Sequence, residues 1–192
     1  KVFAQQLNLL AFDKVIVLDP HSDAAAAAIN NMVAVPQQTC LLQSRRLREA
    51  LAAGEFMLVA PDAGALKKID AVVKASGAAE YAILSKVRDV ASGALTGFAL
   101  LAGDVAGKDV LIVDDLCDAG GTFLGSAQVL RDAGARSVSL YVTHGIFSKG
   151  IDNLLNNGID AVYTTTSLAP ANLQHPQLSL IDIDAIYQAY GR

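Results

Sequence analysis

Two acidic residues and a glycine-rich turn follow an apolar, strand-like stretch of this chain. Asp114 and Asp115 come directly after residues 110–113, and residues 118–122 (Asp-Ala-Gly-Gly-Thr) lead into a helix-like stretch. Free N–H groups at the start of a helix bind phosphate, and glycines let the backbone approach that group closely. Because the two carboxylates would repel a phosphate, they suit sugar hydroxyls or a divalent cation instead. The spacing therefore predicts a site for a phosphorylated ribose.

The sequence motifs of two common phosphate-binding loops are absent here. No lysine follows the glycines at 120 and 121, as a Gly-x-x-x-x-Gly-Lys-Ser/Thr loop requires, and the Gly-x-Gly-x-x-Gly spacing of dinucleotide folds is missing as well. The remaining alternative is an ordinary strand-to-helix turn, in which the glycines only satisfy the backbone geometry. An acidic pair followed by Asp-x-Gly-Gly-Thr favours the binding loop over that alternative.

Other residues with binding chemistry follow further strand-like stretches. His21, Asp62 and Lys86 each come a few residues after an apolar run, as Asp114 does. In an open parallel sheet, ligands bind at the carboxyl ends of the strands. We therefore expect these four side chains to share one site. His21 by itself favours a hydrogen-bonding role, since Mg²⁺ prefers oxygen ligands to an imidazole nitrogen.

Asp62, Ala63 and Gly64 begin a second predicted strand-to-helix turn. The N–H groups of such a turn form a concavity for anions, which here would suit a diphosphate. The alternative is that Asp62 is a plain helix N-cap, and the two roles can coexist.

Lys86 and Arg88 are two cations one residue apart, and Gly93 and Gly97 follow them. A mobile loop that closes over phosphates would carry such charges, because phosphoryl transfer depends on neutralising the transferred group. The alternative is an exposed basic turn at the edge of the sheet.

The elements that must position these residues alternate between strands and helices. Apolar runs predict strands at residues 15–18, 56–60, 81–84, 110–113, 138–142, 161–164 and 178–181. Helical spacing predicts helices at residues 2–10, 41–52, 63–75, 123 to a cap at Gly134, 151–156 and 183–190. This alternation indicates an α/β fold, a parallel sheet with helices on both faces.

The composition agrees with a compact enzyme and argues against other classes. With 192 residues, 53% of them hydrophobic, the chain can bury a core for one domain, or for one domain and part of another. A net charge of −4 makes nucleic acid or an anionic membrane a poor partner. There is no apolar run long enough for a membrane span and no leader, and two cysteines are too few for a disulfide framework. We therefore expect a cytoplasmic protein.

Taken together, these motifs resemble the type I phosphoribosyltransferase family, and within it the ribose-phosphate diphosphokinase family. Residues 110–123 are similar to the phosphoribosyl-binding loop, and residues 19–23 to the segment with the metal-binding histidine. Residues 58–65 are similar to the diphosphate loop and 86–89 to the base of the flexible loop, and 141–148 match the strand and turn that follow. The resemblance covers residues 2 to about 166, in the family's order.

The resemblance implies a type I phosphoribosyltransferase-like fold and an activity. Members of this family transfer diphosphate from ATP to the anomeric hydroxyl of ribose 5-phosphate and release phosphoribosyl diphosphate and AMP. The partners implied are ATP, ribose 5-phosphate and further copies of the same chain in a homo-oligomer. The cofactor implied is Mg²⁺.

The resemblance also implies a role for each motif. Lys86 and Arg88 would close on the transferred phosphate as catalytic residues, and His21, Asp62 and Asp114 would contact Mg²⁺. The residues implied to bind substrate are Asp62, Ala63, Gly64, Asp114, Asp115, Asp118, Ala119, Gly120, Gly121 and Thr122.

Two departures from the family pattern bear on the domain organisation and the loop. Members of the family have two similar lobes, and this chain begins near the end of the first. We expect residues 1–38 to be a remnant of that N-terminal lobe, 39–168 the phosphoribosyl-binding lobe, and 169–192 a C-terminal return strand and helix. Ala119 stands where the family usually has threonine, which removes one hydroxyl donor but keeps the backbone cradle.

Two other functions stay open. A nucleobase phosphoribosyltransferase would share the loop at residues 114–122 but would need a hood that selects a base, and no segment of the chain suits it. A non-catalytic regulatory subunit of a synthetase assembly would fit a chain without the front lobe. Release of AMP from ATP and ribose 5-phosphate would distinguish the diphosphokinase from both.

Overall fold

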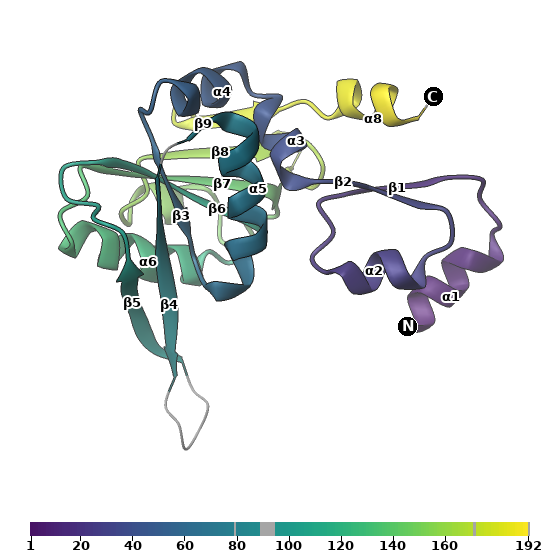
Figure 1. Cartoon of the computed structure of the whole chain (residues 1–192), viewed down its shortest axis with the longest axis horizontal. Coiled ribbons are helices and arrows are strands. Elements are labelled where there is room, and N and C mark those ends of the chain that lie inside the picture. The colour runs from purple at the N-terminus through teal and green to yellow at the C-terminus, as the bar shows by residue number, and fades with distance from the viewer. Residues whose placement is uncertain (79, 89–94, 171, 192) are drawn as a thin grey trace.

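A seven-stranded sheet forms the centre of the described part of the protein. The computed structural model describes residues 1–78, 80–88, 95–170 and 172–191 (Figure 1). The strands lie in the order β5-β4-β3-β6-β7-β8-β9, and every neighbouring pair is parallel except β4 and β5, which are antiparallel. The strands are β3 (Met57–Ala60), β4 (Tyr81–Arg88), β5 (Leu95–Ala102), β6 (Asp109–Cys117), β7 (Ser137–Gly145), β8 (Ala161–Thr165) and β9 (Leu178–Ile181).

Helices cover both faces of this sheet, as the alternation of elements predicted (Figure 1). Along β6, Val110 and Ile112 pack into one core while Leu111 and Val113 pack into the other, because successive side chains of a strand point to opposite faces. The first core contains side chains of α6 (Gly121–Asp132) and α7 (Asp152–Leu155). The second contains side chains of α3 (Gln37–Leu42), α4 (Arg45–Ala52) and α5 (Leu66–Ser76).

A smaller unit lies beside the large sheet (Figure 1). It contains two parallel strands, β1 (Val15–Leu18) and β2 (Met32–Val35), with α1 (Val2–Leu9) and α2 (Asp23–Ala28). The C-terminal helix α8 (Asp184–Tyr190) packs on these strands through Ile186, which shares a small core with Leu18 and Val35. The segment 169–192 is therefore divided, with its strand in the large sheet and its helix on the small one.

The predicted elements are present, and the differences have local causes. The helix expected at 41–52 is two helices, because Ser44 caps α4 by accepting a hydrogen bond from the N–H of Leu47. β6 and β7 extend past their apolar runs, since Asp114 pairs with Val142 in the ladder although it is polar. β2 and β5 were not predicted. β5 belongs to an antiparallel hairpin, so the sheet is mostly rather than wholly parallel.

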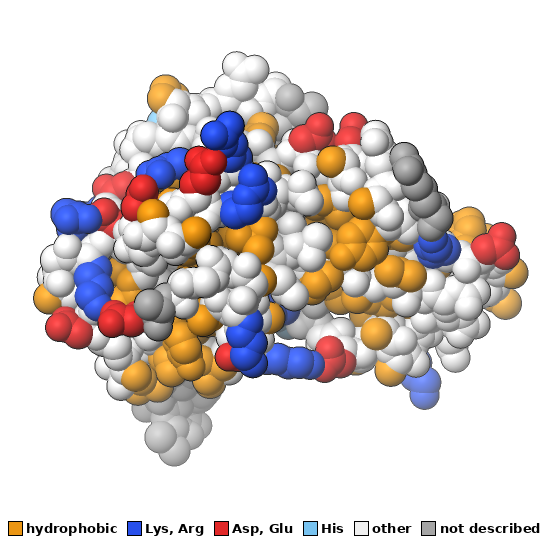
Figure 2. Space-filling model, turned by 45° about the horizontal axis from the view of Figure 1, so that its top comes forward, with side chains coloured by type: hydrophobic (Ala, Val, Ile, Leu, Met, Phe, Trp, Pro, Cys, Tyr) orange, Lys and Arg blue, Asp and Glu red, His pale blue; other side chains and the backbone are white. Residues whose placement is uncertain are grey.

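The surface carries both signs of charge. On the face drawn in Figure 2, lysine and arginine side chains lie beside aspartate and glutamate side chains, and the coloured residues of that face form no continuous basic patch. No helix in the described residues is long and apolar enough to cross a membrane.

Candidate functional site

A cleft of about 810 Å³ opens at the carboxyl ends of β3 and β6. From this pair the chain continues to β4 on one side and to β7 on the other, so the cleft lies at the switch point of the sheet, where α/β folds bind ligands. The residues that line it are His21, Asp62, Gly64, Ala65, Lys68, Lys86, Asp114, Asp115, Leu116, Asp118, Ala119, Gly120, Gly121, Thr122 and Phe123.

The structure brings most of the sequence-predicted site residues into this one cleft. His21, Asp62, Lys86 and Asp114 all line it, together with the whole loop 118–122. Ala63 is not among the lining residues. Arg88 ends β4, but its side chain lies outside the described part of the protein, as does Gly93.

The loop 118–122 leaves its backbone donors unused. β6 ends at Cys117, and α6 begins at Gly121 with Gly120 as its N-cap in the left-handed region, at φ +83°. A Cβ atom at Gly120 would also lie 2.6 Å from Leu154 Cδ2, so a glycine is required here. The N–H groups of residues 118–122 donate no hydrogen bond to any described residue. Five consecutive donors at a helix N-terminus thus remain available for an anion.

The two neighbouring carboxylates have opposite environments. Burial, together with the nearby Asp115 and Asp62, raises the pKa of Asp114 to about 6. Burial also acts to raise the pKa of Asp115, but hydrogen bonds from Lys68 and His21 outweigh it, and the net shift is downward. Asp115 is therefore firmly ionised, whereas Asp114 gains most from a cation placed beside it.

Asp62 combines a capping contact with an ion pair. Its Oδ1 accepts hydrogen bonds from the N–H groups of Gly64 at 2.9 Å and Ala65 at 3.2 Å, so the side chain caps the 3₁₀ turn Ala63–Ala65 that precedes α5. Its Oδ2 accepts from Lys86 Nζ at 2.8 Å. Burial would raise the pKa of Asp62, but Lys86 and the two N–H groups lower it overall. An anion at this turn would compete with Asp62 for both N–H groups.

Lys86 lies within a strand rather than after one, which differs from the prediction. β4 continues to residue 88 because it pairs with β5, and Lys86 is opposite Phe98 in that pairing. Its ammonium group reaches the cleft and contacts Asp62. The hairpin can thus bring a cation over the two loops that follow β3 and β6.

The predicted metal ligands do not form a preformed cluster. In the described residues, no group of three or more His, Cys, Asp or Glu side chains is arranged to hold a metal ion. His21 Nδ1 lies 2.8 Å from Asp115 Oδ2, and both oxygens of Asp62 already accept hydrogen bonds. Mg²⁺ is commonly held by one or two carboxylates together with waters and substrate phosphates. Asp114, a partly buried carboxylate facing the cleft, fits such a site.

Sequence reasoning missed Lys68. Its side chain is 25% exposed, and its Nζ lies 2.8 Å from Asp19 Oδ1 and 3.0 Å from Asp115 Oδ2. A signal was present in the sequence. Lys68 is three residues after the buried Ala65 and four before the buried Val72, which places it on the inner face of α5.

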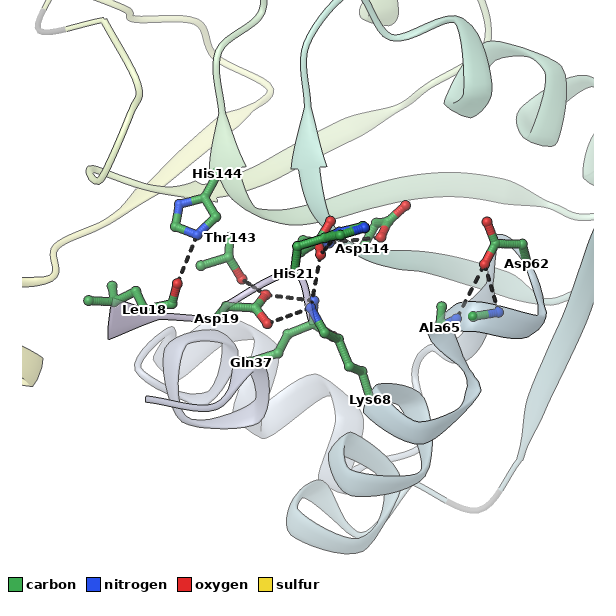
Figure 3. Close-up of polar contacts among 12 residues, drawn as sticks. Leu18, Asp19, His21, Gln37, Asp62, Ala65, Lys68, Asp114, Thr143 and His144 are labelled. Atoms are coloured by element: carbon green, nitrogen blue, oxygen red, sulfur yellow. Dashed lines mark hydrogen bonds and ion pairs between the residues drawn. The ribbon is translucent and has the colours of Figure 1, made fainter. Parts of the chain in front are cut away.

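His144 links the end of β7 to two other segments of the chain. Its Nε2 lies 3.0 Å from the carbonyl oxygen of Leu18, and its Nδ1 lies 2.8 Å from Ser167 Oγ. The contact with Leu18 joins the end of β7 to the end of β1 (Figure 3), and the contact with Ser167 joins it to the segment after β8.

Comparisons with known proteins agree with the predicted resemblance. The ribose-phosphate pyrophosphokinase of Vibrio parahaemolyticus is 33% identical over 174 residues, which cover 88% of this chain and 53% of that protein. The enzyme of the same name from Shewanella oneidensis is 32% identical over 191 residues, covering 97% of this chain and 59% of that protein. The chain thus spans somewhat more than half the length of these relatives. Pyrophosphokinase and diphosphokinase are two names for one activity.

A solved structure and a family model lead to the same group. The crystal structure of phosphoribosylpyrophosphate synthetase from Mycobacterium smegmatis matches with a TM-score of 0.83 at 25% identity, over 98% of this chain and 61% of that one. A family model described as the phosphoribosyl synthetase-associated domain matches residues 93–189, half of the chain. The chain therefore belongs to the phosphoribosyl synthetase-associated domain family.

Proposed function

We propose that this chain is the phosphosugar-binding part of a ribose-phosphate diphosphokinase. The observation that carries the proposal is the row of five backbone N–H groups at residues 118–122 that have no acceptor among the described residues, next to Asp114 and Asp115. The donors suit the 5-phosphate of ribose 5-phosphate, and the carboxylates suit its hydroxyl groups. The similarity to ribose-phosphate pyrophosphokinases supports the same substrate.

In the proposed reaction, the anomeric oxygen of ribose 5-phosphate attacks the β-phosphorus of ATP. The bond between the β-phosphorus and the oxygen that bridges it to the α-phosphate breaks, AMP leaves with that oxygen, and the anomeric hydroxyl loses its proton. Asp115, ionised and held by Lys68 and His21, would orient the ribose hydroxyls. Lys86, held by Asp62 in the structure, would exchange that partner for the transferred phosphate.

Mg²⁺ would neutralise the phosphate oxygens, and Asp114 is the carboxylate that we propose to hold it. Its raised pKa supports this, because a neighbouring cation favours the charged form of a buried carboxyl group. His21 and Asp62 would contribute only by exchanging their present partners. We further propose ATP as the diphosphate donor, a homo-oligomeric assembly and a cytoplasmic location. Size-exclusion chromatography with light scattering tests the assembly.

The phosphate-binding role is tested by calorimetry of ribose 5-phosphate with the 192-residue chain. Thr122→Ala should weaken binding about tenfold or more, because it removes a hydroxyl donor that lines the cleft, and the fold should persist because Thr122 does not belong to the apolar core. Asp132→Ala, on the exposed end of the same α6, is the matched control. Unchanged affinity in Thr122→Ala would refute the assignment.

The reaction itself is tested by product analysis. Release of AMP from ATP and ribose 5-phosphate supports the diphosphokinase. Diphosphate release that depends on an added nucleobase would replace it with a nucleobase phosphoribosyltransferase. Binding of ribose 5-phosphate without turnover would assign the chain a non-catalytic role in a synthetase assembly.

A further inference from the structure

A buried aspartate joins the small sheet to the large one. Asp19 follows β1, its side chain is 2% exposed, and its backbone lies in the left-handed region at φ +39°. Three donors from three different elements converge on its carboxylate (Figure 3). Lys68 Nζ of α5 lies 2.8 Å from Oδ1, and Thr143 Oγ1 of β7 and Gln37 Nε2 of α3 donate to Oδ2 at 2.6 and 3.0 Å.

Lys68 extends this network into the cleft. The same ammonium group lies 3.0 Å from Asp115 Oδ2, the oxygen that also contacts His21 Nδ1 at 2.8 Å. Asp115 Oδ1 accepts no hydrogen bond from any described residue. Lys68 and His21 therefore hold one oxygen of Asp115 and leave the other for a ligand.

Of the two residues that contact Asp115 Oδ2, Lys68 makes the stronger interaction. The side chain of His21 is 91% exposed, whereas that of Lys68 is 25% exposed. Charge interactions weaken in water and strengthen where water is excluded, so the contact with Lys68 contributes more to the orientation of Asp115. Without Lys68, Asp19 and Asp115 would both lose their cationic partner in a buried place, which is costly.

We propose that Lys68 is a positioning residue of the phosphosugar site. By bridging Asp19 and Asp115, it orients Asp115 toward the ribose hydroxyls and fixes the strand end that carries His21. It contacts the sugar only through Asp115. This inference rests on the proposed function for the identity of the ligand, and it predicts which end of the ligand depends on Lys68.

The test compares two ligands and two adjacent lysines. Lys68→Met should weaken the binding of ribose 5-phosphate about tenfold, because the hydroxyl-binding carboxylate loses its orientation. Binding of inorganic phosphate should stay unchanged, because the ion pairs of Lys68 in the described residues are with Asp19 and Asp115 and not with the loop 118–122. Lys67→Met is the matched control, since Asp23 is the one ion-pair partner of Lys67 among the described residues and both side chains are more than 80% exposed. Lys68→Arg, which keeps the charge, should restore most of the affinity.

A merely structural role would give a different pattern. General loss of structure would weaken both ligands alike and would not be rescued by arginine. Equal loss for ribose 5-phosphate and phosphate, or wild-type affinity for ribose 5-phosphate in Lys68→Met, would therefore overturn the inference. If Lys68→Met does not fold, Lys68→Gln removes the charge while keeping an N–H donor. The affinities of that variant for ribose 5-phosphate and for phosphate then test the inference in the same way.

Failure of the proposed function can be recognised separately. If the wild-type chain binds phosphate no more weakly than ribose 5-phosphate, or binds neither, the proposed function fails. Hydrogen exchange at residues 19–23 then decides the inference about Lys68. Exchange should be faster there in Lys68→Met than in Lys67→Met if Lys68 holds this strand end, and equal exchange in the two variants would refute it.

Discussion

Asp114→Asn should make the protein more stable while weakening its binding site. The substitution keeps the shape of the side chain and an oxygen that can accept the hydrogen bond now donated by the N–H of Asp115 to Asp114 Oδ1. It removes only the charge. In the folded chain that charge is unfavourable, because Asp114 is partly buried and lies near Asp115 and Asp62.

The pKa of Asp114 sets the magnitude and the pH range. Burial raises this pKa from 3.8 to about 6. The folded state therefore holds the proton more tightly than the unfolded state, so the stability of the wild-type protein falls as pH rises through this interval. A difference of about two pH units corresponds to about 3 kcal/mol, and the open side of the cleft reduces it, so we expect Asp114→Asn to add about 1–3 kcal/mol at neutral pH.

Urea unfolding followed by circular dichroism across about pH 4 to 8 measures this effect. The gain in the free energy of unfolding should be absent at the acidic end and complete above about pH 6. Asp132→Asn on the exposed end of α6 is the matched control. Affinity for ribose 5-phosphate should fall in Asp114→Asn although stability rises. A variant that is less stable than wild type at neutral pH, or equally stabilised at every pH, would refute the reasoning.

Other substitutions test packing, capping and burial. Gly125→Ala would drive a methyl group into the ring of Phe98 on β5, and should cost about 1–3 kcal/mol in urea unfolding, whereas Gly121→Ala, which meets no atom within 4 Å, should cost far less. Ser44→Ala removes the cap of α4 and should lower the free energy of unfolding by about 1 kcal/mol, which a second hydroxyl at this position, Ser44→Thr, should largely avoid. Burial raises the pKa of the Cys117 thiol to about 12, so iodoacetamide should modify it only after unfolding at about pH 8, and rapid modification of the folded protein by mass spectrometry would contradict this.

The element types could be predicted wherever apolar residues mark a buried face. Both sides of β6 are covered by helices, and residues 110–113 are accordingly a continuous apolar run. The residues at which the strands begin and end were less predictable. Asp114 belongs to β6 because it pairs with β7, and pairing of backbone groups leaves no pattern in one strand's sequence. The same reason explains why β5 was missed, since it is an edge strand held by one neighbour.

The members of the site could be predicted in part. The loop at residues 118–122 carries its own local signal, because a glycine at the N-cap of α6 and the polar residues around it are contiguous in the chain. The residues that contact Asp115 have no such local signal in the sequence. His21 and Lys68 are 94 and 47 residues away in the chain, and the helical spacing that places Lys68 on the inner face of α5 does not identify Asp115 as its partner.

The sequence by itself determined the alternation of strands and helices, the turn with free N–H groups and the acidic pair beside it, because each depends on residues close together in the chain. Only the tertiary structure decided that Lys68 pairs with both Asp19 and Asp115, and that Lys86 meets Asp62. It also separated the two adjacent carboxylates into one that is firmly ionised and one whose pKa is raised. The physical reason is that burial and charge at a site depend on which distant elements pack around it, and sequence spacing does not encode those distances.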